Sequence, residues 1–401
     1  MIHVGVFGYG TVGSGVVEVL TTNEKVIEKN VGEKVKVKAI LDLREFPGDP
    51  FEKLIVHDVH QIVDDEEIDV VCETMGGVNA AYEFTKMALS NGKSVCTSNK
   101  ELVALHGPEL IKLAKKNNCS YKFEASVGGG IPIIRPLQDA ITADEIKAVI
   151  GIVNGTTNYM LTKMDKEEAD FNDVLKEAQD LGYAELHPEA DVEGYDAARK
   201  IAILSSLVYG KTVNYEDVHT EGITNISSRD FRYAKHLGKT IKLLAKFENR
   251  DTGSYAIVAP FFVDLESPLS NVNDVYNAIL VRGNMLGDAM FFGRGAGKLP
   301  TASAVCADVV ECAKNKGKHL PCDWKDEHVK LDGFDNSLKN FFVRVKAEDR
   351  ELTEEIFGEV EKVNEGFFDE FAFVTKEMTE ADFASKKALI GPCINVIRLQ
   401  K

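Results

Sequence analysis

Residues 2–13 read Ile-His-Val-Gly-Val-Phe-Gly-Tyr-Gly-Thr-Val-Gly, and this stretch decides the fold. Its first six residues predict a buried parallel strand, because they form an almost continuous apolar run. The glycines that follow have GxGxxG spacing, and a helical pattern then continues to about Asn30. Such glycines allow a tight turn and bring backbone amides close to a pyrophosphate at the helix N-terminus. The sequence therefore predicts a dinucleotide-binding domain of the Rossmann type. The residues expected at the phosphates are Gly8, Gly10, Thr11, Val12 and Gly13.

The next strand carries the signal for the ribose of the nucleotide. Residues 35–41 predict a second parallel strand, and Asp42 follows where such folds place the acid that binds the adenosine ribose. Arg44 lies two residues further on and could instead meet a 2′-phosphate. The two residues point to different dinucleotides, so the sequence predicts NAD or NADP without choosing between them.

Further strand–helix units extend the predicted parallel sheet. Residues 69–72 and 94–97 predict strands that are each followed by polar or glycine residues and a helix. Ligands bind at the carboxyl ends of parallel strands, which places Thr97 near the cofactor. Lys100 starts the next helix, where the positive end of the helix dipole disfavours an ammonium. A lysine there suits proton transfer, with an ordinary surface lysine as the alternative.

A glycine-rich loop follows the strand expected at 121–124. Glu124 precedes Gly128, Gly129 and Gly130, which leave carbonyl groups exposed in an irregular loop. Oxygen ligands of this kind can hold a hard monovalent cation. A hinge between domains explains the same glycines equally well, so both interpretations stay open.

Beyond this loop the pattern changes to a second domain. Residues 148–153 predict a strand that runs into Asn-Gly-Thr-Thr-Asn-Tyr at 154–159, where a helix begins. Thr156 is expected either to cap that helix or to mark a backbone-amide site for a carboxylate. The two uses cannot be separated from the sequence.

An acidic loop and the helix after it form the candidate substrate site. Asp196 and Lys200 lie four residues apart on the expected helix and therefore share one face. Glu185 lies in the preceding loop, eleven residues before Asp196. Two carboxylates and one ammonium would suit a small zwitterion with its own amine and carboxylate. The alternative is a solvated surface pair, which is the usual meaning of an i,i+4 Asp–Lys spacing.

Strand-like segments at 239–247, 255–263 and 277–282 predict an antiparallel sheet with helices on one side. An exposed edge in the 240–282 region would favour a dimer, and a homodimer or homotetramer is expected. Gly297 precedes an apolar helix at 301–314, which is expected to return to the nucleotide domain and to place Gly297 near the cofactor.

The expected fold class is α/β with three parts. Residues 1–133, completed by 300–318, form the dinucleotide-binding domain, and residues 134–299 form an α+β substrate and dimerisation domain. After a polar linker, the pattern at 340–399 alternates strand, helix, strand, helix and strand. Residues 332–401 are therefore predicted to be a small α+β domain of regulatory type.

Composition excludes several classes of function. The formal net charge of −17 gives no electrostatic attraction to nucleic acid or to an anionic membrane. The seven cysteines show neither CxxC nor zinc-site spacing, and their odd number suits reduced thiols. The sequence shows no signal peptide and no apolar run long enough for a membrane span. A soluble, cytoplasmic protein is expected.

The motifs together resemble a homoserine dehydrogenase over residues 1–315. This resemblance implies NAD(P)-linked interconversion of L-homoserine and L-aspartate 4-semialdehyde, a step towards threonine, methionine and isoleucine. The tail resembles an ACT domain in its order of strands and helices but lacks the usual Asp-Arg-Pro-Gly turn at 347–353. The motifs that carry the resemblance are Gly-Tyr-Gly-Thr-Val-Gly (8–13), Thr-Ser-Asn-Lys (97–100), Glu-Ala-Ser-Val-Gly-Gly-Gly-Ile-Pro-Ile-Ile (124–134), Asn-Gly-Thr-Thr-Asn-Tyr (154–159), the stretch 182–200 and Gly-Ala-Gly…Pro-Thr-Ala-Ser-Ala (295–304).

The resemblance also implies roles for single residues. Lys200 matches the lysine assigned as acid and base, and Lys100 matches a second catalytic lysine on the nicotinamide side, where it also contacts the cofactor. Glu185 matches the carboxylate that holds the substrate amine, with Asp196 beside it. The remaining substrate-binding candidates are Thr156 and Tyr183, and the family's sodium site matches Glu124 and the carbonyls of Val127, Gly129 and Ile131.

Three alternatives compete with this interpretation. One is a related NAD(P) oxidoreductase that acts on another amino acid. A second is a non-catalytic regulator that senses a nucleotide and an amino acid, although the retained polar residues argue against it. A phosphorylating semialdehyde dehydrogenase is disfavoured, because no cysteine stands in a recognisable nucleophile context with a histidine.

Overall fold

The computed structural model describes residues 1–250 and 253–400, which form two compact units. Unit 1 comprises Met1–Asp144, Ala202–Asn214 and Phe291–Val329. Unit 2 comprises Glu145–Ile201, Tyr215–Met290 and Lys330–Lys401. The chain passes between the units several times, so each unit is built from segments that are distant in sequence.

Unit 1 is built on a parallel six-stranded sheet with the strand order β3-β2-β1-β4-β5-β6. The predicted apolar strands are confirmed, and the order reverses direction between β1 and β4, as in doubly wound nucleotide-binding sheets. Ligands bind in such sheets outside the carboxyl ends of the strands at that reversal. The strands are β1 (Ile2–Phe7), β2 (Val35–Leu41), β3 (Ile55–Val56), β4 (Ile68–Glu73), β5 (Ser94–Thr97) and β6 (Tyr121–Lys122).

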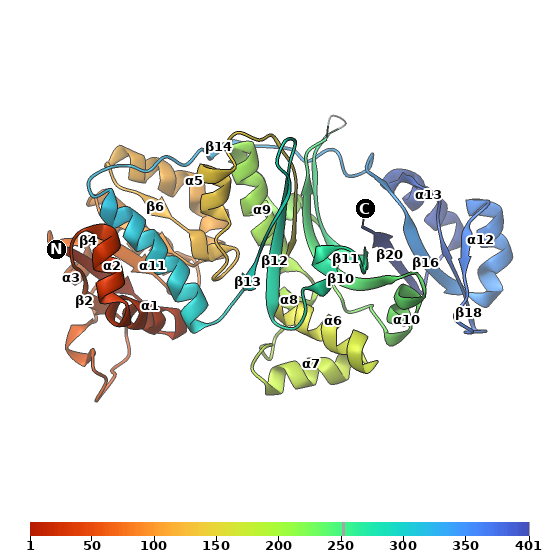
Figure 1. The fold of residues 1–401 in the computed structure, drawn as a ribbon, viewed down its shortest axis with the longest axis horizontal. Helices are drawn as coiled ribbons and strands as arrows, with labels where there is room; N and C mark the ends of the chain where they lie inside the picture. The colour runs from red at the N-terminus through yellow and green to blue at the C-terminus, as the bar shows by residue number, and fades with distance from the viewer. Residues whose placement is uncertain (251–252, 401) are drawn as a thin grey trace. The chain divides into compact units, whose positions relative to one another are not determined.

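Three helices pack together on the first half of this sheet: α1 (Thr11–Thr22), α2 (Glu24–Val31) and α11 (Lys298–Lys314). The single helix predicted to about Asn30 is in fact two, because the chain breaks at Asn23. Figure 1 shows α11 beside α1, although the two are far apart in sequence. Glycine allows this approach, since a Cβ on Gly15 would lie 2.9 Å from the Lys298 carbonyl oxygen. Helix α11 therefore packs with the first helices of unit 1.

The second half of unit 1 contains α3 (His60–Val63), α4 (Asn79–Ser90) and α5 (Lys100–Lys116). Helix α5 carries Pro108 in its interior, and the preceding Gly107 packs so closely on Trp324 that a Cβ would lie 3.0 Å from its indole ring. Trp324 precedes β14 (Lys325–His328), which pairs with β8 (Lys211–Thr212). The polar segment expected as a linker after α11 therefore covers α5 before the chain enters unit 2.

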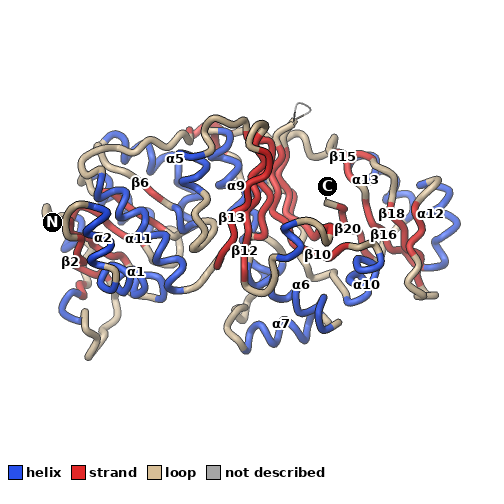
Figure 2. Tube along the Cα trace, viewed as in Figure 1, coloured by secondary structure: helices blue, strands red, loops and turns tan. Residues whose placement is uncertain are grey.

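Unit 2 contains a larger sheet with the order β13-β12-β7-β10-β11-β20-β16-β18-β17, and β9 (His219–Thr220) also pairs with β11. Its central strands are antiparallel, as predicted, and Figure 2 shows them grouped around β10 and β12. The prediction of an exposed edge at 240–282 is wrong, because β10, β11 and β12 each pair on both sides. One edge of the sheet is β13 (Gly287–Arg294), a strand that the sequence pattern did not predict, and the other is β17. The central strands are β7 (Ile146–Ile152), β10 (Lys239–Glu248), β11 (Tyr255–Asp264) and β12 (Tyr276–Gly283).

The C-terminal tail contributes four strands of the same sheet. Strand β20 joins β11 in parallel at Phe261–Arg398 and Phe262–Leu399, so the tail continues the central sheet of unit 2. The first helix of the tail ends at Phe357, because Gly358 has a positive φ of 72°, and the short strand β17 follows. The tail elements are β16 (Phe341–Lys346), α12 (Arg350–Phe357), β17 (Glu361–Val363), β18 (Glu370–Val374), α13 (Glu380–Ile390) and β20 (Asn395–Leu399).

The helix expected after the acidic loop is α9, which begins in unit 2 and continues into the Ala202–Asn214 segment of unit 1. Helices α6 and α10 both pack against β10. None of the helices in the described residues is long and apolar enough to cross a membrane. The helices are α6 (Gly155–Glu167), α7 (Phe171–Asp180), α8 (Glu189–Val192), α9 (Tyr195–Tyr209) and α10 (Ser228–His236).

Candidate active site

The turn between β1 and α1 has the geometry of a phosphate-binding loop. Gly8 has a φ of +89°, which glycine adopts without strain. A Cβ on Gly13 would lie only 1.9 Å from the Gly8 carbonyl oxygen, so this position admits no side chain. Gly10 is the N-cap of α1 and supplies no capping side chain. The first amides of α1, including those of Thr11 and Val12, have no partner inside the helix and can bind an anion.

Asp42 and Arg44, the two residues that point to different cofactors, form one ion pair. Arg44 donates from Nε to Asp42 Oδ1 and from Nη2 to Oδ2, both at 2.9 Å. Asp42 Oδ2 also accepts a hydrogen bond from the Tyr9 amide at 2.8 Å, within the glycine turn. These hydrogen bonds, led by those from Arg44, hold the pKa of Asp42 well below its usual range. The acid is therefore ionised beside the turn, with an exposed guanidinium next to it.

A buried carboxylate that no sequence motif indicated supports the end of β5. Glu73 is fully buried, and its Oε2 accepts a 2.5 Å hydrogen bond from the Thr97 hydroxyl. Thr97 Oγ1 in turn accepts one from the Asn99 amide. Asn99 caps α5, whose first residue is Lys100. Thr97 therefore connects the buried acid to the start of the helix that carries Lys100.

Glu73 should make the stability of the protein depend on pH. Burial raises the pKa of Glu73 to about 7, above the ordinary value of 4.5 that it has when unfolded. The folded state thus binds the proton more tightly, and the free energy of unfolding should fall as pH rises from about 4.5 to 7. A shift of this size corresponds to roughly 3 kcal/mol, at ~1.4 kcal/mol per pH unit. Urea titrations measure the free energy of unfolding of Glu73→Gln and of wild type. The value for Glu73→Gln relative to wild type should be higher at pH 8 than at pH 5 by roughly 3 kcal/mol. Glu83→Gln, on the exposed side of α4, should show the same difference at both values.

Asp196 and Lys200 form the buried centre of the substrate-site candidate. Lys200 Nζ donates to Asp196 Oδ2 at 2.7 Å and to the Val153 carbonyl at 2.7 Å. Asp196 is 3% exposed and Lys200 is 9% exposed, so the alternative of a solvated surface pair is wrong. The contact to Val153 places the ammonium at the carboxyl end of β7, where the strand leads into α6.

Asn154 and Asp191 complete this cluster, and neither was predicted as a site residue. Asn154 Nδ2 donates to Asp196 Oδ2 at 2.9 Å and to Asp191 Oδ1 at 2.7 Å. Its Oδ1 accepts from the Thr157 amide, which makes Asn154 the N-cap of α6. The available signal was an asparagine directly before a predicted helix. Because one amide caps α6 and binds both carboxylates, it fixes three segments to one another.

The prediction that Thr156 caps α6 is wrong, since Asn154 takes that position. Thr156 Oγ1 instead donates to the Tyr183 carbonyl at 2.6 Å and so holds the acidic loop against the start of α6. The Tyr183 ring is half-exposed and meets Tyr159 edge-on, with 5.0 Å between ring centroids. Glu185 follows at the surface of the loop, where Gln179 Nε2 binds its backbone oxygen. The structure thus places Asp196 and Lys200 in contact and leaves the Glu185 side chain exposed to incoming solutes.

The glycine-rich loop after β6 is anchored in unit 1 rather than loosely hinged. Glu124 is buried, and its carboxylate accepts hydrogen bonds from the amides of Ile133, Ile134 and Arg135 at 2.6–2.8 Å. Gly129 has a φ of +57° and lies so close to Gly295 that a Cβ would come within 2.3 Å of its carbonyl oxygen. The loop therefore has a defined shape that requires glycine.

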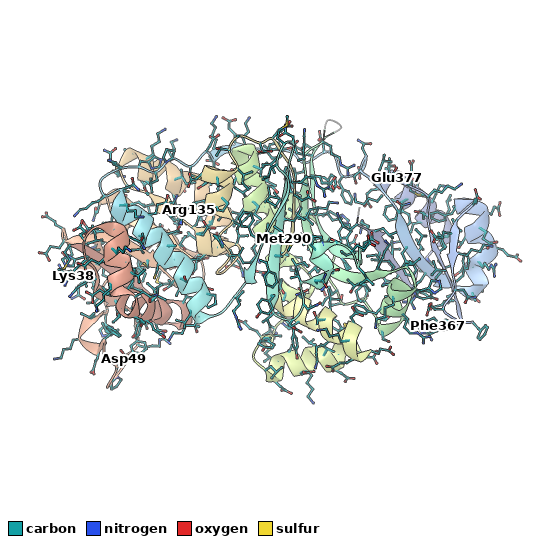
Figure 3. The ribbon with its side chains drawn as sticks, viewed as in Figure 1. Lys38, Asp49, Arg135, Met290, Phe367 and Glu377 are labelled. Carbon is teal, nitrogen blue, oxygen red and sulfur yellow. The ribbon has the colours of Figure 1, made fainter. Side chains whose placement is uncertain are left out.

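Charged groups on α11 fix the other side of this loop. Arg135, labelled in Figure 3, binds Asp308 at 2.7 Å and Glu311 at 2.8 Å. Asp308 Oδ2 accepts a hydrogen bond from the Glu124 amide, and burial raises its pKa to about 7. The proposed sodium ligands Val127 and Ile131 are buried in the same loop. Within the described residues, no cluster of three or more His, Cys, Asp or Glu side chains could hold a metal ion.

Gly297, the last cofactor candidate, is the N-cap of α11 and has a φ of +116°. The Thr301 amide donates to the Gly297 carbonyl, which begins the helix that packs on α1. Gly297 therefore lies at the start of α11 in unit 1, and its place near the cofactor stays a prediction.

Comparison with known proteins assigns these features to one family. Residues 8–124 match the model described as homoserine dehydrogenase, NAD binding domain, and residues 132–310 match the homoserine dehydrogenase model. The homoserine dehydrogenase of Bacillus subtilis is 44% identical over 317 residues, which cover 78% of this chain and 73% of the relative. The chain belongs to the homoserine dehydrogenase family. It is an NAD(P)-dependent oxidoreductase that acts on a CH–OH group and interconverts L-homoserine and L-aspartate 4-semialdehyde.

Solved homoserine dehydrogenases share the fold as well. One from Thiobacillus denitrificans superposes over 100% of this chain and 98% of its own, with a TM-score of 0.90 and 34% identity. A hyperthermophilic archaeal homoserine dehydrogenase in complex with NADPH covers 80% of this chain and 99% of its own, with a TM-score of 0.68 and 27% identity. The first match includes the C-terminal tail, which the family models do not reach. A non-catalytic regulator is not favoured by these relatives.

Proposed function

We propose that Lys200 moves the hydroxyl proton of homoserine, within a cluster formed by Asp196, Asn154 and Asp191. The observation that carries this proposal is the buried Lys200–Asp196 pair at the end of β7. Hydride transfer between the substrate carbon and the nicotinamide C4 requires a partner that takes or returns the hydroxyl proton. In the reducing direction the Lys200 ammonium donates this proton to the developing alkoxide, and in the oxidising direction the neutral amine accepts it.

The residues around Lys200 fix where that proton can go. The Val153 carbonyl and Asp196 Oδ2 each accept one of its N–H groups, which restricts the rotation of the ammonium. Asn154 restrains Asp196 in turn. Packing and hydrogen bonds restrict the proton donor to orientations that suit proton transfer. This restriction is the benefit of a pre-organised site. Lys100, in the nucleotide-binding unit, is proposed as the second catalytic lysine on the nicotinamide side.

Glu185 is proposed to bind the substrate ammonium from the acidic loop. Glu185→Gln keeps the size of this exposed side chain but removes its charge, so the KM for homoserine should rise by about 10–100-fold, as for a lost charge-assisted hydrogen bond of about 1.5–3 kcal/mol. The kcat should change less than the KM. Glu189→Gln, which removes another exposed carboxylate of the same region, serves as the control. Equal KM values for wild type and Glu185→Gln would exclude Glu185 as the partner of the amine.

The Asp42–Arg44 pair is proposed to accept either dinucleotide. Asp42 can bind the ribose hydroxyls of NAD, and Arg44 can leave Asp42 to meet the 2′-phosphate of NADP. The exposure of the guanidinium supports this, since its movement costs little. Initial rates with homoserine and each dinucleotide, compared with rates on lactate, malate and glutamate, test both the cofactor and the substrate assignment.

Other features of the family are proposed on narrower grounds. An ACT-like character of the tail is supported by its strand order β17-β18-β16-β20 with one helix after β16 and one before β20. A sodium ion on Glu124 and the carbonyls of Val127, Gly129 and Ile131 is supported by the fixed, glycine-dependent loop. A homodimer or homotetramer in the cytoplasm, and the biosynthesis of threonine and methionine, remain predictions.

A further inference from the structure

Unit 2 has a cationic pocket of about 270 Å³ at one end of its central sheet. The chain has a net charge of −17, yet the ionisable side chains that line this pocket include five basic groups and one carboxylate, Glu248. The strand register brings Arg282, Ala148, Glu248 and Tyr255 into one row across four strands. The basic residues are Lys147, Lys246, Arg250, Arg282 and Lys339.

Among the residues that the structure describes, the basic groups at this pocket share their carboxylates. Glu248 serves two of them, because Oε1 binds Lys246 while Oε2 binds Arg250. Lys147 binds Glu145 and Arg282 binds Asp288, each at 2.6 Å. Lys339 lies 3.4 Å from Glu380, which also binds Arg398 at 2.6 Å.

Two of these basic side chains are buried, and removing their positive charges from water costs free energy. Lys246 is 5% exposed and Lys339 is 4% exposed. Burial lowers the pKa of Lys339 to about 8 despite Glu380, and burial also lowers the pKa of Lys246 despite Glu248. A buried ammonium is stable only when anions or hydrogen bonds replace its water shell. An anion in this pocket would supply what the protein carboxylates do not.

Tyr255 adds a neutral donor to the pocket. It is 1% exposed, and its hydroxyl lies beside the Glu248 carboxylate. Burial, together with the nearby Glu248 carboxylate, raises the pKa of Tyr255 and so keeps its proton in place. Lys339 Nζ lies 4.4 Å from the centre of its ring. A hydroxyl that keeps its proton can donate a hydrogen bond to an anionic oxygen in the pocket.

We propose that this pocket binds a small tetrahedral dianion, either inorganic phosphate or a phosphomonoester. Arginine guanidinium groups bind phosphate oxygens through paired hydrogen bonds, and lysines add point charges. A dianion carries charge opposite to the five basic groups that line the pocket and has several oxygens with which to bind them. Strand β7 runs from this pocket, at Lys147 and Ala148, towards Val153, whose carbonyl binds Lys200.

Calorimetric titration of the full-length protein tests this proposal, with sodium phosphate and glycerol 3-phosphate as probes against sodium chloride at equal ionic strength. Arg250→Gln combined with Arg282→Gln should weaken binding at least tenfold, because two charge-assisted contacts are lost. Both arginines are about 40% exposed, so these changes should not unfold the protein. Tyr255→Phe should weaken binding while leaving every charge in place.

Arg232→Gln is the matched control, since this half-exposed arginine also pairs with a glutamate and packs over an aromatic ring. It should leave the affinity unchanged. Tight binding of glycerol 3-phosphate identifies a phosphomonoester site, and binding of phosphate alone identifies a free oxyanion site. The proposal fails if neither probe binds saturably. It also fails if the double variant keeps the wild-type affinity, which would place the anion at the glycine turn of the nucleotide site instead.

Discussion

Lys200→Ala should lower kcat by about 10²–10⁴-fold, which is the usual contribution of a positioned general acid or base. The methyl group of alanine can neither donate nor accept the hydroxyl proton. Water would then have to replace a proton donor that Val153 and Asp196 hold in place. The KM for the dinucleotide should change little, because the cofactor candidates lie in the glycine turn of unit 1. Initial rates measured at saturating homoserine and at saturating semialdehyde give kcat in the two directions.

The control must separate lost chemistry from lost structure. Removing the ammonium leaves the Asp196 carboxylate buried beside Asn154, and this costs stability. The variant should therefore be assayed below its own unfolding transition, as followed by circular dichroism. Lys200→Arg keeps the charge but moves the proton donor and should also be slow, whereas Lys176→Ala on the exposed face of α7 should match wild type. A folded Lys200→Ala enzyme with wild-type kcat would remove Lys200 from the mechanism.

The sequence predicted those parts of the site that depend on neighbours along the chain. The glycine turn at 8–13 and its flanking strand and helix follow from local rules for backbone conformation and apolar periodicity. The pairing of Asp196 with Lys200 follows from helix geometry alone. Their burial does not, because it depends on β7 and α6, which reach the same place from another part of the chain.

The features that the sequence could not predict are contacts between distant segments. Asn154 caps α6, Asp191 lies in α8 and Asp196 lies in α9, and these three side chains meet only in the folded chain. Their spacing in the sequence does not predict this contact. The cationic pocket escaped prediction for a related reason. Lys246 in β10 and Lys339 in the tail are expected at the surface by residue type, yet both are buried, and the tail joins the central sheet through the pairing of β20 with β11.

Arg344→Ala should lower the free energy of unfolding by about 3–5 kcal/mol, the usual cost of removing one member of a buried ion pair. Arg344 lies in β16 of the tail and is 3% exposed. It donates to Asp230 of α10 at 2.7 Å and to Glu370 of β18 at 2.6 Å. Among the described residues, its loss would leave Asp230 buried without this cation and Glu370 with Arg229 alone, at 3.5 Å. Urea unfolding of the full-length chain, followed by circular dichroism, measures the change.

The same experiment tests whether the tail is a structural part of unit 2 or a detachable appendage. If the tail and the central sheet unfold together, Arg344→Ala should move one transition that includes both, because Arg344 bridges the two. Two separate unfolding transitions, with the tail unfolding first, would contradict the conclusion that the tail and the central sheet form one structural part. Arg350→Ala removes an exposed tail arginine paired with Glu354 and should change the free energy by no more than about 1 kcal/mol, as surface pairs do. An equal effect of both substitutions would mean that the Asp230–Arg344–Glu370 cluster contributes nothing beyond a surface ion pair.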